Sequence, residues 1–187
     1  DRGGVGRVLT VMPCRWINGW PMLGDEKGKV PDTVRPLKSG EPEATIVKAD
    51  DFSQAKLGLH WQWNHNPDDS KWSLKNGRLR LQSMPAEELM WARNTLTQRI
   101  IGPTSVTTVE LYTKGMKDGD VAGLGNINTP CSWIGIVKNG KEITLRWFEQ
   151  ATNDTLDQPV SLDMKGDRIW LRMIGDFDND MATYYFS

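Results

Sequence analysis

The stretch that decides the fold is residues 132–150, SWIGIVKNGKEITLRWFEQ. Two segments rich in Ile, Val, Leu and aromatic residues flank the dipeptide Asn139-Gly140, which is favoured in tight type I′ hairpin turns. A second pair of this kind follows at 168–186, where RIWLRMI and ATYYF lie on either side of the turn-forming DFDND of 176–180. Both stretches predict antiparallel β-hairpins.

Outward from these hairpins, short β-prone segments recur from residue 43 onward, each ended by Gly, Asn, Asp or Pro. No amphipathic helix longer than a couple of turns interrupts them, although Pro85 and the acidic residues after it favour a helical turn within 85–93. The sequence therefore predicts an all-β protein, an antiparallel β-sandwich. The predicted strands are 44–47, 57–63, 78–82, 94–101, 105–112, 120–125, 132–138, 141–150, 158–162, 168–176 and 181–186.

Composition excludes several classes of function. The 187 residues carry a net charge of -1 without a basic run, so nucleic acid is not an expected partner. No apolar run approaches the length of a membrane span, so no membrane is expected either. Cys14 and Cys131 lack zinc-site spacing and are predicted to be free thiols, which identify no cellular compartment. The DFDND segment lacks the glycine and distal glutamate of a calcium loop, so a plain turn is predicted, and no cofactor or metal site is evident.

Tryptophan is unusually frequent, with nine residues against four Phe and three Tyr. The large flat ring of tryptophan suits both the core of a sandwich and a surface on which sugar rings stack. In the segment 59–66, LHWQWNHN, strand alternation places Trp61 and Trp63 on one face and His60, Gln62 and Asn64 on the other. Core packing and ligand contact are both open for these residues. No pair of carboxylates and no nucleophilic triad is recognisable.

The first 42 residues differ in composition and hydrophobic pattern from the rest. Strands are predicted at 6–12 and 21–23, and residues 24–42 have the Gly, Pro, Lys and Asp content of a linker. The stretch 6–24, GRVLTVMPCRWINGWPMLG, resembles the last blade of the catalytic β-propeller in family 43 glycoside hydrolases. The motifs after it resemble, in order, the C-terminal concanavalin-like sandwich of the β-xylosidase and α-L-arabinofuranosidase branch: DDFS (50–53), LHWQWNHN (59–66), WSL (72–74), GRLRL (77–81), NTLTQR (94–99) and GDVAGL (119–124).

The resemblance implies a division into the end of a five-bladed propeller (1–24), a linker (25–42) and a jelly-roll sandwich (43–187) that stops before its final strands. The parent enzyme would hydrolyse glycosides with inversion, using an Asp base and a Glu acid on propeller blades. Those blades are absent from this sequence, so the chain is expected to be a fragment without catalytic residues. Calcium is an option only for the parent enzyme.

The resemblance also implies where substrate would be met. In that branch a sandwich loop reaches the mouth of the active site, and TQRIIGP (97–103) is similar to it. Gln98 and Arg99 would hydrogen-bond sugar hydroxyls, while Ile100 and Ile101 would wall the pocket; an ordinary strand connection is the other interpretation. Trp61 and Trp63 are further candidates for substrate binding.

The expected function is therefore an accessory sandwich that packs on the missing propeller and helps to close the active site of an enzyme acting on xylo-oligosaccharides or arabinose-decorated xylan. The alternatives are a non-catalytic carbohydrate-binding module and a purely structural sandwich.

Overall fold

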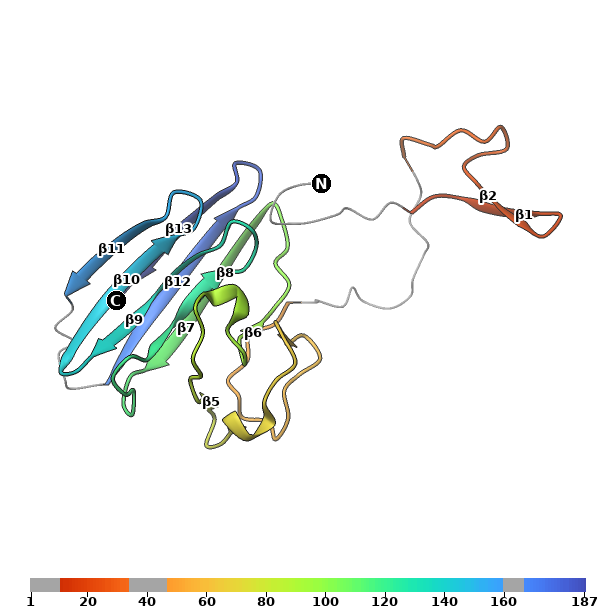
Figure 1. The fold of residues 1–187 in the computed structure, drawn as a ribbon. Coiled ribbons are helices and arrows are strands. Elements are labelled where there is room, and N and C mark those ends of the chain that lie inside the picture. Colours follow the sequence, from red (N-terminus) through yellow and green to blue (C-terminus); the bar gives the residue numbers. More distant parts are fainter. Residues whose placement is uncertain (1–10, 34–46, 160–166) are drawn as a thin grey trace.

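The computed structural model describes residues 11–33, 47–159 and 167–187. Its main body consists of two antiparallel sheets (Figure 1). One sheet has the order β11-β10-β9-β8, and its strands are β8 (Val121–Asn126), β9 (Ser132–Asn139), β10 (Glu142–Glu149) and β11 (Asp154–Pro159). The other has the order β13-β12-β7, with β7 (Thr104–Tyr112), β12 (Arg168–Asp176) and β13 (Met181–Phe186). The all-β sandwich expected from the sequence is confirmed.

Both predicted hairpins are present, and one turn differs in type. In the β9–β10 hairpin Asn139 pairs with Glu142, so Gly140 and Lys141 form the two-residue loop. Gly140 has a φ of +58° and Lys141 does not have a positive φ. This is the type II′ arrangement, which needs a left-handed residue only at the first loop position. The predicted type I′ turn centred on Asn139-Gly140 is therefore wrong. The turn is of type II′ and its centre lies one residue later, at Gly140-Lys141, although Gly140 still provides the positive φ.

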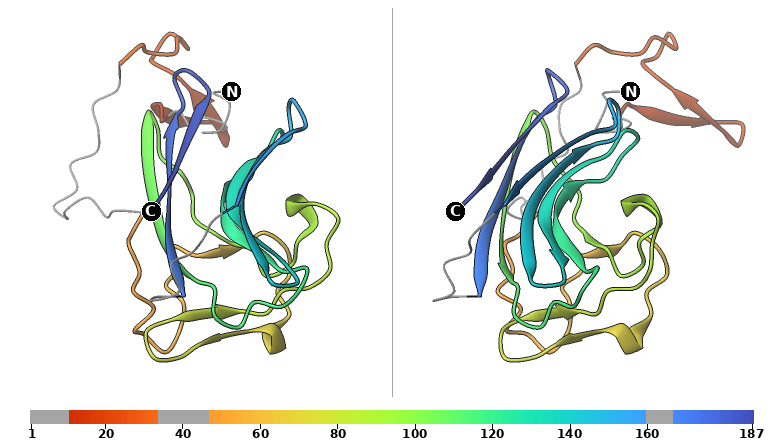
Figure 2. Two further views of the ribbon diagram at one scale, coloured as in Figure 1. Left: turned by 90° about the vertical axis from the view of Figure 1, so that its left-hand side faces the viewer. Right: turned by 60° about the vertical axis from the view of Figure 1, so that its left-hand side comes forward.

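The core lies between the two sheets, which stack face to face (Figure 2). Alternating residues of facing strands point into it, as the period of two in a strand requires. Ile136 and Leu171 are completely buried and Ile169 is nearly so. The buried cluster consists of Ile134, Ile136, Leu145, Ile169 and Leu171, and Val109, Leu111, Leu124 and Tyr184 pack against it.

Three small two-stranded sheets accompany the sandwich. They are β1 (Cys14–Ile17) with β2 (Trp20–Leu23), β3 (Gln62–Trp63) with β6 (Leu96–Thr97), and β4 (Trp72–Leu74) with β5 (Leu79–Leu81). Two short 3-10 helices, η2 (Asp69–Lys71) and η3 (Leu89–Trp91), complete the described elements. The helix η3 confirms the helical turn predicted within 85–93.

Several predicted strands are shorter than expected or misplaced. Only Gln62–Trp63 of 57–63 is a strand, because the Trp61 N–H donates to the Gly58 carbonyl oxygen and closes a turn. Within 94–101 only Leu96–Thr97 pairs. The strand predicted at 158–162 begins at Asp154 instead. The predicted strands 6–12 and 44–47 lie largely outside the described residues, and their described residues, 11–12 and 47, are not in strands.

The cysteine prediction is confirmed, because Cys14 is exposed, Cys131 is buried and both are free thiols. Burial raises the pKa of the Cys131 thiol. Among the described residues there is no helix of the length and hydrophobicity that a membrane crossing needs. The division into 1–24, 25–42 and 43–187 stays a prediction.

Candidate functional site

The loop of residues 98–103 begins beside the β3–β6 pair, where Gln62 lies opposite Thr97. At this end the Gln98 side-chain Nε2 donates a 3.0 Å hydrogen bond to the Lys48 carbonyl oxygen. Gln98 therefore ties the loop to the segment that enters the sandwich. Its amide nitrogen has a protein partner, whereas Oε1 is buried without one among the described residues.

The far end of the loop is held by the start of β7 and by the β12–β13 turn. The Ser105 hydroxyl donates to the Ile101 carbonyl oxygen at 2.7 Å, and the Ile101 N–H donates to the Ser105 Oγ at 3.2 Å. The Phe177 N–H donates to the Pro103 carbonyl oxygen at 2.9 Å. The loop is therefore anchored at both ends.

The tip between these anchors is presented to solvent. Arg99 is exposed, Ile100 is half-buried, and Ile101 is 43% exposed. Arg99 forms no hydrogen bond or ion pair with any residue in the described part of the chain, so its planar donors are available to a ligand. A cation and an isoleucine side chain are thus exposed on a restrained backbone.

Trp61 lies in a polar and aromatic cluster at the entrance to the sandwich. Its indole Nε1 donates to Asp50 Oδ2 at 2.7 Å, and its ring stacks on Phe52 with centroids 5.6 Å apart. His60 Nε2 lies 3.5 Å from the same Asp50 oxygen. His60 and Trp61 therefore approach one carboxylate together, and the predicted separation of these two residues onto opposite faces is wrong because residues 58–61 form a turn.

Trp63 packs internally as well. Its ring lies 5.3 Å from that of Trp72, and the Trp72 indole donates to Asp69 Oδ1 at 2.9 Å. Both rings are half-buried. Trp61 thus contacts the rings of Phe52 and His60, and Trp63 contacts that of Trp72. These contacts fit the packing role that the sequence left open beside ligand contact.

A hollow of about 550 Å³ is lined from Ala49 onward, the residue that follows the Lys48 bonded by Gln98. The Asp51 carboxylate in this hollow accepts a hydrogen bond from the Ser53 N–H, and hydrogen bonding from the Ser53 side chain and backbone lowers the Asp51 pKa. The hollow therefore presents the Asp51 carboxylate to solvent, whereas the side chains of His60 and Asp50 are each only 14% exposed. No three His, Cys, Asp or Glu side chains gather as a metal site in the described segments. The hollow is lined by Ala49, Asp50, Asp51, Ser53, Gln54, Lys56, Gly58 and His60.

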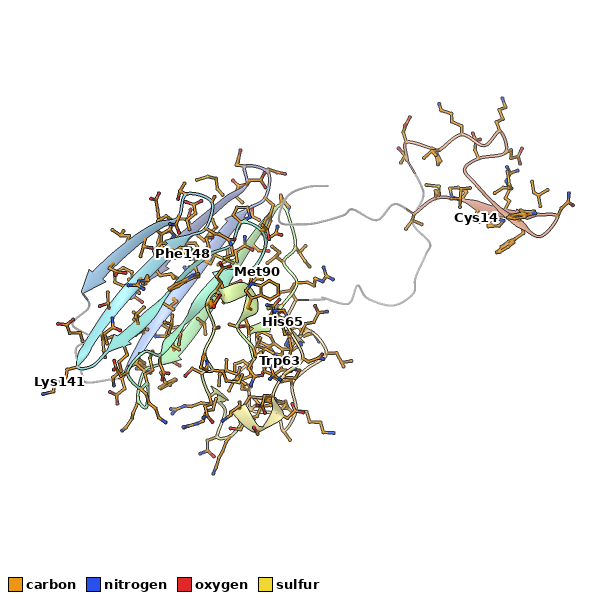
Figure 3. The ribbon with its side chains drawn as sticks, viewed as in Figure 1. Cys14, Trp63, His65, Met90, Lys141 and Phe148 are labelled. Carbon is orange, nitrogen blue, oxygen red and sulfur yellow. The ribbon has the colours of Figure 1, made fainter. Side chains whose placement is uncertain are left out.

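The sequence did not single out Trp91 as a candidate. Trp91 ends η3 and is 68% exposed, and its ring stacks on His65 with centroids 5.8 Å apart and planes at 14°. His65 Nε2 and Asn64 Nδ2 both bond the Met90 carbonyl oxygen, at 2.6 and 2.9 Å (Figure 3). One face of the indole is thus held against a fixed imidazole. The only signal for this arrangement in the sequence is a tryptophan inside a predicted helical turn.

The fold and the order of the motifs agree with a known family. Residues 49–187 match the family described as the β-xylosidase C-terminal concanavalin A-like domain. The chain belongs to this family. The concanavalin-like character of the sandwich and its place within family 43 glycoside hydrolases are thereby confirmed.

Relatives of this domain family include named glycosidases. The chain is 32% identical over 98% of its length to a putative β-xylosidase of Xylanibacter ruminicola, of which it covers 34%. It is 35% identical over 63% of its length to a β-xylosidase of Formosa agariphila, of which it covers 25%. The chain therefore spans only about a third and a quarter, respectively, of the length of these two relatives.

A solved structure of an engineered family 43 glycoside hydrolase, described as having both endo-xylanase and exo-arabinofuranosidase activity, aligns with all of this chain and 41% of that one. The TM-score is 0.75 at 30% identity.

Proposed function

We propose that this chain is the accessory sandwich of a family 43 glycoside hydrolase that cleaves xylo-oligosaccharides or arabinose-decorated xylan with inversion. In this proposal the catalytic Asp and Glu belong to a propeller, and the loop 98–103 closes the substrate pocket formed there. The observation that carries the proposal is the loop itself, which is anchored at Gln98 and Ser105 and exposes Arg99 and Ile101 between them.

The β1–β2 hairpin supports a propeller as partner. Trp16 and Trp20 are each 73% exposed, and Leu23 is 58% exposed. A two-stranded hairpin is at best marginally stable in water, and several exposed large apolar side chains favour burial against another part of a protein. The end of a propeller blade would supply that surface.

Kinetics of the full-length enzyme that carries this chain test the proposal. Arg99→Ala should raise KM for xylobiose, because exposed planar donors to sugar hydroxyls are lost. Ile101→Ala should lower kcat/KM several-fold by opening the pocket wall. Leu156→Ala is the matched control, since Leu156 is 65% exposed on β11 and far along the chain from the loop. Unchanged kcat/KM in both loop variants would refute the pocket-closing role.

A carbohydrate-binding module is the second candidate. The 68% exposed Trp91 favours it, because the indole face opposite the one that stacks on His65 is a surface for sugar stacking. Titration of this chain with xylo-oligosaccharides separates the two candidates. Binding that is lost in Trp91→Ala supports the module, and absence of binding supports the accessory role.

A further inference from the structure

The outer face of the three-stranded sheet carries a hollow of about 370 Å³ away from the loop 98–103. Strand alternation explains its lining. Ile169, Leu171 and Met173 are buried, whereas Trp170 and Arg172, which alternate with them, point outward. Arg172 lies opposite Tyr185 on one side and Thr108 on the other. The hollow is lined by Thr108, Trp170, Arg172, Tyr185, Phe186 and Ser187. Its volume is within the range of small-ligand sites, about 300–1,000 Å³.

Two of the three aromatic residues that line this hollow, Trp170 and Tyr185, belong to neighbouring strands and remain open to water. Trp170 is 45% exposed and Tyr185 is 50% exposed. The sheet fixes the backbone of both residues. The Trp170 N–H donates to the Ser187 carbonyl oxygen at 2.9 Å and the Ser187 N–H donates back at 3.1 Å, while Tyr185 pairs with Arg172. Exposed aromatic rings supply an apolar face against which the C–H face of a pyranose can stack.

Arg172 lines the same hollow, and its guanidinium has hydrogen-bond donors that are not used inside the protein. Its Nε donates to the Thr108 Oγ1 at 3.1 Å, which orients the group. Its two terminal nitrogens have no hydrogen-bond partner in the described part of the chain. A guanidinium fork of this kind matches a carboxylate in a two-bond arrangement.

The other cations near this face already have partners. Arg78 stacks on the Tyr112 ring at 3.9 Å, and Arg168 pairs with Glu110 at 2.9 Å. The strands β7 and β12 together carry Arg168 and Arg172 against Glu110 and Asp176, so their formal charges cancel. Arg168 is paired with Glu110, and Asp176 accepts hydrogen bonds from Asn179, so Arg172 is the cation of these two strands that has no carboxylate partner among the described residues. An anionic group is therefore favoured beside Arg172.

We propose that this face binds an acidic oligosaccharide, with a sugar ring stacked on Trp170 and a uronic acid carboxylate on Arg172. The choice of a glycan as ligand rests on the proposed function, whereas the choice of a carboxylate rests on the two terminal nitrogens of Arg172, which have no partner among the described residues. The site would hold a uronate-substituted xylan chain away from the loop 98–103.

The test is calorimetric titration of the protein with xylotriose carrying one glucuronic acid branch and, in parallel, with unbranched xylotetraose. The acidic ligand should bind more tightly, and its affinity should fall as salt rises. Arg172→Gln should weaken binding of the acidic ligand about 10- to 100-fold and abolish the preference. Arg172→Lys keeps the positive charge but loses the planar pair of donors. Its affinity for the acidic ligand should lie between those of the unmodified protein and Arg172→Gln. Trp170→Ala should weaken both ligands, and Leu156→Ala should change neither.

Equal affinity for the acidic and neutral ligands would overturn the proposal, as would full binding by Arg172→Gln and Trp170→Ala. Competition by polyglutamate as strong as by the acidic oligosaccharide would reduce the site to a charged patch and also overturn it. Hydrolysis of an aryl xyloside by the full-length enzyme, measured separately, should not change in Arg172→Gln. If the unmodified full-length enzyme hydrolysed no xyloside but still bound the acidic oligosaccharide through Arg172, the proposed function would be refuted and this site would stand.

Discussion

Replacing Ser105 with alanine removes both hydrogen bonds that close the loop 98–103 onto β7, the 2.7 Å bond to the Ile101 carbonyl and the 3.2 Å bond from the Ile101 N–H. A net hydrogen bond contributes about 0.5–1.5 kcal/mol. Two such bonds together would contribute about 1–3 kcal/mol. Because both are exposed, we expect the pair to stabilise the closed loop by about 1–2 kcal/mol, in the lower part of that range.

Hydrogen exchange reports this loss at one amide. A stabilisation of that size corresponds to exchange of the Ile101 amide about 5- to 25-fold faster in Ser105→Ala. In the full-length enzyme the looser loop tip should also lower kcat/KM for xylobiose, by up to about tenfold. The reason is that a mobile loop orients the bound sugar less well toward the catalytic groups.

Ser83→Ala is the matched control, since it removes a hydroxyl bonded to Asp120 at 2.5 Å and leaves the loop anchors in place. An Ile101 amide that exchanges at the same rate in Ser105→Ala and in the unmodified protein would refute the reasoning.

Three further predictions concern the sandwich. Leu171→Ala should destabilise the fold by about 2–5 kcal/mol in urea unfolding, because it leaves a cavity in the buried cluster; the exposed Leu156→Ala should stay within about 0.5 kcal/mol of the parent. Gly140→Ala should cost about 1–2 kcal/mol, because φ is +58° there although space is open, and a thermal melt showing no loss would contradict the turn assignment. The hydrogen bonds from Arg146 lower the pKa of Asp157 below its usual 3.8, so this carboxylate stabilises the fold above that value and the contribution is lost as pH falls toward the folded-state pKa. As the pH is lowered from 5 to 2, the free energy of unfolding of Asp157→Asn should therefore fall less steeply than that of the unmodified protein.

The sequence was most informative where strands are long and buried on one face. Strands 168–176 and 181–186 have the predicted bounds, because alternating apolar residues and a turn of Asp and Asn define both ends. The short pairs β3–β6 and β4–β5 carry little periodic signal. β11 begins at Asp154, earlier than predicted. This edge strand of polar residues is held by its pairing with β10 and by the Arg146–Asp157 ion pair. Neither interaction leaves a periodic pattern in the sequence.

The candidate site was predictable in part. The resemblance pointed to residues 98–101, and the structure adds that Gln98 is an anchor with its amide bonded to Lys48. The placement of His60 and Trp61 against Asp50 could not be predicted, because a turn at 58–61 replaced the expected strand. The outer-face hollow at Trp170 depends on pairing between strands about 60 residues apart, which no local pattern in the sequence reveals.

The most direct test of the central claim is a crystal structure of the full-length enzyme with xylobiose bound. The account predicts that Arg99 or Ile101 lies in contact with the sugar, within about 4.5 Å, as part of the pocket wall. A bound sugar enclosed by propeller residues alone, with the loop 98–103 out of contact, would contradict it.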